Sequence, residues 1–254
     1  AARGTQNPND SLETMPSNNF NVSGTLKGQQ AAISISANTI VDNINILNGA
    51  SIKGAIIHEG SGFSNLTFGG KFSKEQSSNS LYEDVDSSFN LSYNGNITGQ
   101  RNINMHIAGG TLEYNGTANV NSITINDKAT LKGAGTYILG EQPAAQRSND
   151  GATSNRGTFT NNGTFDLGDN IETINITGNY TQGPTGNLLV DFDTNNKSDK
   201  LNITEGSATL NGKITLTPQV DYYYNGQKIT ISVIGVENNY TITNQASAVL
   251  NNIS

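Results

Sequence analysis

The fold is decided by two related stretches, Gly110-Thr111-Leu112-Glu113-Tyr114-Asn115-Gly116 and Ala129-Thr130-Leu131-Lys132-Gly133. Each begins with a small residue and a threonine, continues with apolar and polar residues in alternation, and ends at a glycine. Alternation with a period of two is typical of a strand that buries one face, and glycine permits a tight turn after it. We therefore predict a short strand at each copy.

The same unit recurs at irregular intervals: Gly24-Thr25-Leu26-Lys27-Gly28, Gly157-Thr158-Phe159, Gly163-Thr164-Phe165 and Ala208-Thr209-Leu210-Asn211-Gly212. Other alternating segments add further predicted strands: Ile33-Ile35, Ile44-Ile46, Leu66-Phe68, Leu91-Tyr93, Ile103-Met105-Ile107, Ile123-Ile125, Phe165-Leu167, Leu188-Val190-Phe192 and Ile229-Ile231-Val233. Strands that start roughly every 9 to 13 residues suit either a sandwich or barrel or a β-solenoid.

The composition favours the solenoid. The chain has 254 residues, of which 33% are hydrophobic and 7% aromatic, with no tryptophan. A solenoid needs few apolar residues because neighbouring coils close one another's core, whereas a sandwich of this size would want more, often including a core tryptophan. Since no apolar stripe has helical spacing, we expect an all-β protein with almost no helix.

Charge and cysteine content exclude several classes of function. The formal net charge is −7, and no run of lysine or arginine is present, which argues against binding to nucleic acid or to an anionic membrane. No apolar stretch is long enough for a spanning helix, so we expect no membrane insertion. The absence of cysteine excludes disulfides and cysteine-based metal or redox sites. The start, Ala1-Ala2-Arg3-Gly4, suggests a processed product or a fragment.

Three segments are predicted along the chain. Residues 1–19 are a polar tail or irregular cap, and residues 20–177 form the solenoid, with loops leaving it near 73–88 and 141–156. Residues 178–254 differ in texture and form a C-terminal cap, with hairpin-like turns at Asn211-Gly212 and Asn225-Gly226.

Four blocks in this last segment carry a resemblance: Gly178-Asn179-Tyr180-Thr181-Gln182, Gly186-Asn187-Leu188-Leu189-Val190, Ser198-Asp199-Lys200-Leu201 and Ala208-Thr209-Leu210-Asn211-Gly212-Lys213-Ile214. In this order they resemble the C-terminal passenger region of bacterial autotransporters, which closes with a tyrosine-rich hairpin like Tyr222 to Val233. The resemblance covers roughly residues 103–235. The family's membrane barrel does not follow before Ser254, so we expect the translocator to be missing from this chain.

The resemblance implies a right-handed parallel β-helix with a C-terminal capping or autochaperone module, in a pertactin-like architecture. It also implies export across the outer membrane of a Gram-negative cell, with the protein's own outer-membrane β-barrel as a partner, and a location on the cell surface or outside the cell. The absence of cysteine fits this route, because a passenger crosses the pore unfolded. The expected function is a rigid surface stalk or adhesin associated with virulence, whose C-terminal part promotes folding.

Three alternatives remain open at this level. In the first, the chain is the non-catalytic stem of a secreted subtilisin-like serine protease autotransporter. In the second, it is a carbohydrate-active β-helix. In the third, it is an adhesin whose loops 73–88 and 141–156 bind a host surface protein or glycan. We expect the chain itself not to be an enzyme and to carry no catalytic, cofactor-binding or metal-binding residue.

Several residues bear on this expectation. His58 and His106 lack a nucleophile context, so we predict structural or solvated roles, with His106 pointing outward. Asp191 and Asp193 could place two carboxylates on one strand face about 7 Å apart, as a glycosidase needs, but facing water is the favoured interpretation. The run from Asp191 to Asn195 imitates a calcium loop but has Asn196 where the motif needs glycine.

Other residues have structural interpretations. Glu83, Asp84 and Asp86 form an acidic cluster that we predict to be a solvated part of a loop. Some of the asparagines that recur at strand ends are predicted to stack from coil to coil as inward-facing ladders. Among Tyr222, Tyr223 and Tyr224, alternation predicts that some turn inward and close the core.

Overall fold

The computed structural model describes residues 18–71, 84–141, 156–223, 226–237, 240–242 and 247–250. Most of the predicted tail, residues 1–17, lies outside this part of the chain. So do residues 73–83 and 142–155, which make up most of the two predicted loops, together with Glu83, Tyr224, Asn225 and residues 251–254.

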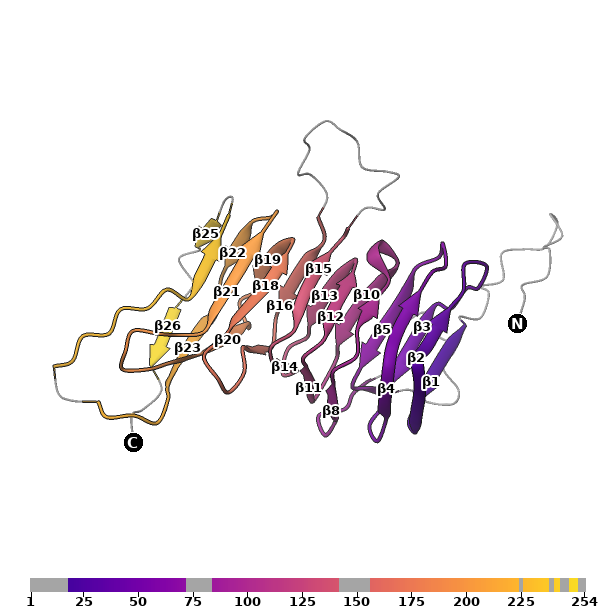
Figure 1. Cartoon of the computed structure of the whole chain (residues 1–254), viewed down its shortest axis with the longest axis horizontal. Coiled ribbons are helices and arrows are strands. Elements are labelled where there is room, and N and C mark those ends of the chain that lie inside the picture. The colour runs from indigo at the N-terminus through magenta and orange to yellow at the C-terminus, as the bar shows by residue number, and fades with distance from the viewer. Residues whose placement is uncertain are drawn as a thin grey trace, which may run out of the picture.

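The described chain forms an elongated all-β body in which strands follow one another along the long axis (Figure 1). The largest sheet has nine strands, here called the nine-stranded sheet. In spatial order they are β1 (Asn19–Val22), β3 (Asn43–Ile46), β5 (Ser64–Phe68), β10 (Ile103–Ile107), β13 (Ser122–Ile125), β16 (Thr158–Asn161), β19 (Asn179–Gln182), β22 (Ala208–Leu210) and β25 (Tyr240–Ile242).

Two further large sheets run beside it. The eight-stranded sheet contains β2 (Thr25–Ile35), β4 (Ser51–His58), β9 (Ile97–Thr98), β12 (Thr117–Val120), β15 (Thr136–Leu139), β18 (Thr173–Thr177), β21 (Lys200–Thr204) and β24 (Ile234–Val236). The seven-stranded sheet contains β8 (Asn90–Tyr93), β11 (Thr111–Tyr114), β14 (Thr130–Lys132), β17 (Thr164–Asp166), β20 (Asn187–Phe192), β23 (Lys213–Pro218) and β26 (Ser247–Leu250).

The order of the strands is cyclic. From β8 onward the chain visits the seven-, eight- and nine-stranded sheets in turn, and each fourth strand pairs with the first. The strand pairs within these sheets are parallel, as between β11 and β14 or between β16 and β19. This arrangement confirms an all-β protein with long parallel sheets and is compatible with a parallel β-helix.

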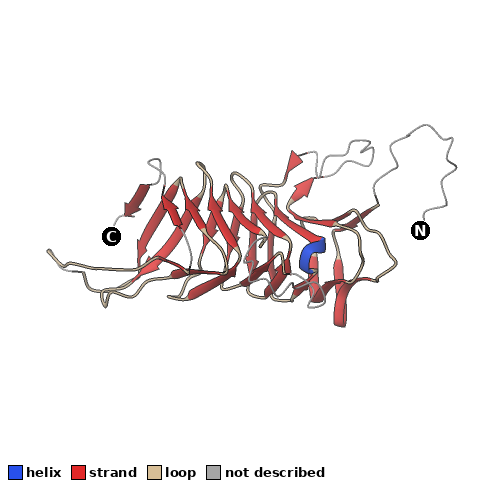
Figure 2. Ribbon diagram, turned by 90° about the horizontal axis from the view of Figure 1, so that it is seen from above, coloured by secondary structure: helices blue, strands red, loops and turns tan. Residues whose placement is uncertain are grey.

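Two local elements interrupt the winding. A short antiparallel pair, β6 (Gly70–Lys71) with β7 (Asp84–Val85), joins the two ends of the first predicted loop. A single 3₁₀ turn, η1 (Gln100–Asn102), precedes β10 and is drawn in blue in Figure 2. The described residues contain no helix with the length and hydropathy of a membrane-spanning segment.

The core lies between the three sheets and is built from in-register apolar rows. Alternate residues of each strand are buried, as in Thr117–Val120, where Ala118 and Val120 are fully covered and their neighbours are not. Aromatic rings stack along the inside, with centroid distances of 5.8 Å for Tyr93–Tyr114 and 6.1 Å for Tyr114–Tyr137. Since each coil is covered by the next, a chain of modest hydrophobicity still forms a continuous core.

Glycine is required at one start of the repeated unit, Gly110. Gly110 has φ of +62°, and a Cβ added there would lie 2.2 Å from the carbonyl oxygen of Phe89 in the preceding coil. Gly24 opens another copy of the unit, but a Cβ there would meet nothing within 4 Å. The small residue of the motif is therefore obligatory only where two coils approach each other.

The C-terminal segment differs from the prediction in two places. The hairpin predicted at Asn211-Gly212 is wrong, because β22 and β23 pair in two different parallel sheets and not with each other. The strand predicted over Ile229–Val233 is also absent. That stretch keeps its alternating exposure but finds no free sheet edge, since β21 already pairs with β18 and with β24, which begins at Ile234.

A hairpin forms elsewhere, over residues 191–199, between β20 and β21. Phe192 pairs antiparallel with Ser198, and the amide of Asp193 donates to the carbonyl of Lys197 at 2.9 Å. The segment after β23 packs on it, since the Tyr223 hydroxyl donates to the carbonyl of Phe192 at 3.3 Å and the Thr230 amide donates to Asn196 Oδ1 at 2.8 Å.

Candidate functional site

His58 lies at the end of β4 and is buried, as a structural role requires. Its Nδ1 accepts the amide N–H of Gly60 at 3.1 Å, which assigns the ring proton to Nε2, 3.0 Å from the hydroxyl of Ser64. Ser64 in turn donates to the carbonyl of Val41. Nε2 is therefore a donor to Ser64 and has no lone pair with which to take its proton, so the pair is not an activated nucleophile.

Burial also lowers the pKa of His58, which keeps the ring neutral. His106 lies in β10 with its neighbours Met105 and Ile107 fully buried, while its own side chain is half-buried on the outward side, as predicted. Burial lowers its pKa as well. The two histidines lie on different strands and do not converge on one site.

Asp191 and Asp193 are not presented as a carboxylate pair on one strand. Asp191 is half-buried in β20, and burial first and the nearby Asp166 second raise its pKa. Asp193 lies beyond the end of β20, where its Oδ1 accepts the amides of Asn195 at 2.8 Å and Lys197 at 2.9 Å. These hydrogen bonds lower its pKa. The resemblance to a calcium loop thus reflects a carboxylate that stabilises the turn of the hairpin.

Asp199 is the residue that sequence reasoning missed. Its side chain is fully buried at the corner before β21, where Oδ1 accepts the amide of Glu172 at 2.9 Å and Oδ2 accepts the amide of Asp191 at 2.7 Å. Burial outweighs these hydrogen bonds and raises the pKa of Asp199 to about 6. Asp199 belongs to the block Ser198-Asp199-Lys200-Leu201 that the sequence already showed, but its burial depends on the hairpin.

The acidic cluster of the first loop is partly described. Asp86 accepts the Ser88 hydroxyl at 2.6 Å and its amide at 3.0 Å, while Asp84 lies 4.0 Å from the Lys71 ammonium across the β6–β7 pair. Both contacts are local, and Asp84 is exposed. Glu83 lies outside the described residues. Among the described residues, no group of three or more histidine, aspartate or glutamate side chains is arranged to hold a metal ion.

Asparagine ladders are present, but mainly on the outward side. On the nine-stranded sheet, Asn43 Nδ2 donates to Asn19 Oδ1 at 2.7 Å, and Asn65 Nδ2 donates to Asn43 Oδ1 at 3.1 Å. Asn202 and Asn175 repeat this on the eight-stranded sheet at 3.0 Å. The stacking is confirmed, whereas the inward orientation is wrong for these residues, since the inward positions between them hold isoleucine and leucine.

The tyrosine run divides between surface and interior. Tyr222 is 96% exposed, so it closes no core. Tyr223 is half-buried, and its ring packs edge-on against Phe192 at a centroid distance of 6.1 Å. Tyr224 lies outside the described residues.

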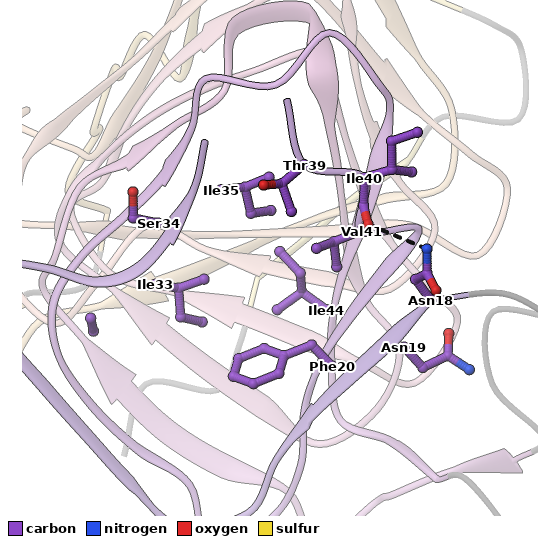
Figure 3. A pocket seen from close by; sticks show the side chains of 11 residues that line it. Asn18, Asn19, Phe20, Ile33, Ser34, Ile35, Thr39, Ile40, Val41 and Ile44 are labelled. Atoms are coloured by element: carbon purple, nitrogen blue, oxygen red, sulfur yellow. Dashed lines mark hydrogen bonds between the residues drawn. The ribbon is translucent and has the colours of Figure 1, made fainter. Parts of the chain in front are cut away.

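A hollow of about 590 Å³ opens at the N-terminal end of the body, among β1, β2 and the segment before β3 (Figure 3). Apolar side chains dominate its lining, including Ile33, Ile35 and the 46% exposed Ile40. Asn18 Nδ2 donates to the carbonyl of Ile40 at 3.4 Å across its rim. The hollow lies at the end of the core, and the described residues that line it include no charged side chain for acid–base chemistry.

Together these features define an all-β protein with parallel sheets whose polar and ionisable side chains act in turns and ladders. Comparisons of the chain with protein-family models, with curated proteins and with solved structures find no match.

Proposed function

We propose that this chain is an exported bacterial passenger of the autotransporter kind, wound as a right-handed parallel β-helix, which serves as a rigid surface stalk or adhesin. The observation that supports this most is the stacking of parallel strands in three long sheets along one axis. Such a body presents its surface at a distance from an attachment point and resists bending, because every coil is hydrogen-bonded to the next.

The C-terminal part, from Gly178 onward, has the role of a folding template in this proposal. Its first strands cover the last coil of the preceding part, since Tyr180 pairs in register with Phe159 and Leu188 with Phe165. The ring centroids of Phe159 and Tyr180 are 5.8 Å apart. Strands added to a formed edge avoid the cost of starting a new sheet.

Truncation at Gly178 tests this role. A chain that ends at Thr177 exposes Phe159 and Phe165 on an open sheet edge, so we expect slower refolding and aggregation at micromolar concentration. Refolding after dilution from urea, followed by circular dichroism and light scattering, measures both. Refolding and solubility equal to those of the full chain would contradict the template role.

The adhesin role is tested by binding to host cells. In the proposal, the predicted loops take part in the contact with a host protein or glycan, and the test targets their segments 73–83 and 142–155. Replacing each segment in turn by a short glycine–serine linker should reduce adhesion to host cells while the thermal melting temperature stays unchanged. Equal adhesion by the parent and both variants would contradict the adhesin role and leave only the stalk role.

A further inference from the structure

The nine-stranded sheet differs from the other two large sheets in its charge. None of its nine described strands contains an aspartate, glutamate, lysine or arginine. The eight-stranded sheet carries lysines in β2, β4 and β21, and the seven-stranded sheet carries both signs in β11, β14, β17, β20 and β23. In a chain with net charge −7, one whole sheet is thus electrically neutral.

Part of this sheet presents a regular array of hydroxyl groups. Thr124, Thr160, Thr181 and Thr209 follow one another in register across β13, β16, β19 and β22. All four are half-buried, while the residues beside them in the strands are fully or nearly fully covered and point into the core. We call this row the threonine face. Adjacent strands lie about 4.8 Å apart, so the row spans about 14 Å.

The hydroxyls of the threonine face are available to a ligand. None of the four makes a hydrogen bond with any other described residue, whereas Thr177 and Thr204 on the eight-stranded sheet bond to each other at 3.3 Å. Each hydroxyl can donate once and accept twice, and each threonine adds a methyl group beside it. The face therefore offers repeated donors, acceptors and small apolar patches without charge.

We propose that the threonine face binds a neutral, extended polysaccharide that lies along the axis of the solenoid. Such a chain carries hydroxyls that both donate and accept, together with C–H surface for the methyl groups, and it has no charge to be paired. The affinity of a repeating ligand for a repeating face increases with the number of contacts, because each weak contact holds the next unit of the ligand close to its own site. The proposal rests on the proposed adhesin function and names the chemistry of its ligand.

The test uses the full chain and two matched pairs of substitutions. Thr160→Val with Thr181→Val removes two hydroxyls of the threonine face and keeps the β-branched shape. Thr130→Val with Thr164→Val makes the same change at paired, half-buried positions of the seven-stranded sheet. Cellohexaose and insoluble cellulose serve as neutral probes, and carboxymethyl cellulose and heparin as charged ones.

We expect the parent chain and the control to bind the neutral probes equally and better than the charged probes. The threonine-face variant should bind roughly tenfold more weakly, since two hydrogen bonds are lost. Binding of cellohexaose and cellulose that is absent in the parent, or equal in both variants, overturns the proposal. Adhesion to host cells measured in parallel separates the two ideas: adhesion that persists when neutral probes do not bind leaves the proposed function intact and removes only this ligand.

Discussion

Glycine, aspartate and asparagine act at single positions where one coil meets the next. Gly110 avoids a clash with the carbonyl of Phe89. Asp199 accepts the amides of Glu172 and Asp191, which no strand pairing joins. Asn43 is hydrogen-bonded to an asparagine in each neighbouring strand. The glycines can be recognised in the sequence because they recur in the repeated unit, and the asparagines because they are numerous. Asp199 does not recur, and its burial follows only from the hairpin that precedes it, so no local pattern could reveal it.

Gly110→Ala should destabilise the protein by about 2 kcal/mol or more, because the new Cβ meets a backbone carbonyl and because φ is positive. Urea unfolding followed by circular dichroism measures the effect. Gly24→Ala is the matched control, since its Cβ would enter open space, and it should change the stability by less than about 0.5 kcal/mol. Equal effects of the two substitutions would contradict the close approach of the coils at Gly110.

The buried carboxyl of Asp199 gives stability a specific pH dependence. Its pKa rises from 3.8 to about 6 on folding, so the folded state binds a proton that the unfolded state has released. Its contribution is therefore fully present below pH 3.8 and is lost as the pH rises through 6. The nearby carboxylates of Asp191 and Asp166 act in the same direction.

Asp199→Asn should flatten this part of the profile. Urea midpoints measured between pH 4 and pH 7 should fall less steeply for the variant than for the parent. Asp127→Asn, at an exposed carboxylate in the turn before β14, serves as the control and should leave the slope unchanged. The same slope in parent and Asp199 variant would show that the carboxyl stays ionised throughout.

At the scale of elements, strands with a strict alternation and a neighbouring edge formed where they were expected. Ile103–Ile107 and Leu112–Tyr114 are examples, and each has in-register partners on both sides. The segment 229–233 alternates as well but has no edge to join, so the same pattern gives an extended segment without a ladder. The alternation therefore predicts which face of a strand is buried. Whether the segment pairs with another strand depends on whether the preceding coils leave a free sheet edge beside it.

The aromatic stack inside the strands contains an unsatisfied hydroxyl that can be tested. The hydroxyl of Tyr137 is buried and has no hydrogen-bond partner among the described residues, whereas that of Tyr93 donates to the carbonyl of Gly54 at 2.9 Å. Tyr137→Phe should therefore raise the free energy of unfolding by about 1 kcal/mol, and Tyr93→Phe should lower it by about the same amount. Thermal and urea unfolding compare the two. A loss of stability in Tyr137→Phe would indicate a bound partner, such as an ordered water.

At the scale of the whole molecule, the low hydrophobic content and the recurrent unit predicted a stack of coils, and the three long parallel sheets agree with it. The long axis follows from counting coils, because from β8 onward each complete coil adds one strand to each of the three sheets. The uncharged character of one sheet could not be predicted, since it depends on which strands share a sheet. Residues 124 and 160 are far apart in the sequence, yet they pair in adjacent strands of this sheet.

Stability should also vary along the axis. Coils in the middle have neighbours on both sides, while β1 and β26 lie at sheet ends, where Phe20 and Leu250 remain 42% and 54% exposed. Hydrogen exchange should therefore be slowest in β10 to β16 and faster toward either end. Uniform protection from β1 to β26 would show that the body unfolds as one unit.

The antiparallel pair of β6 and β7 has a consequence for what the body can carry. Lys71 pairs with Asp84, so the chain leaves the coil and returns to it through a single pair of antiparallel strands. A sequence inserted between them would start and end at nearly one point. The neighbouring coils would therefore not have to move apart to accommodate it. A guest domain whose own termini are adjacent could thus be grafted there without separating the coils on either side, whatever its size.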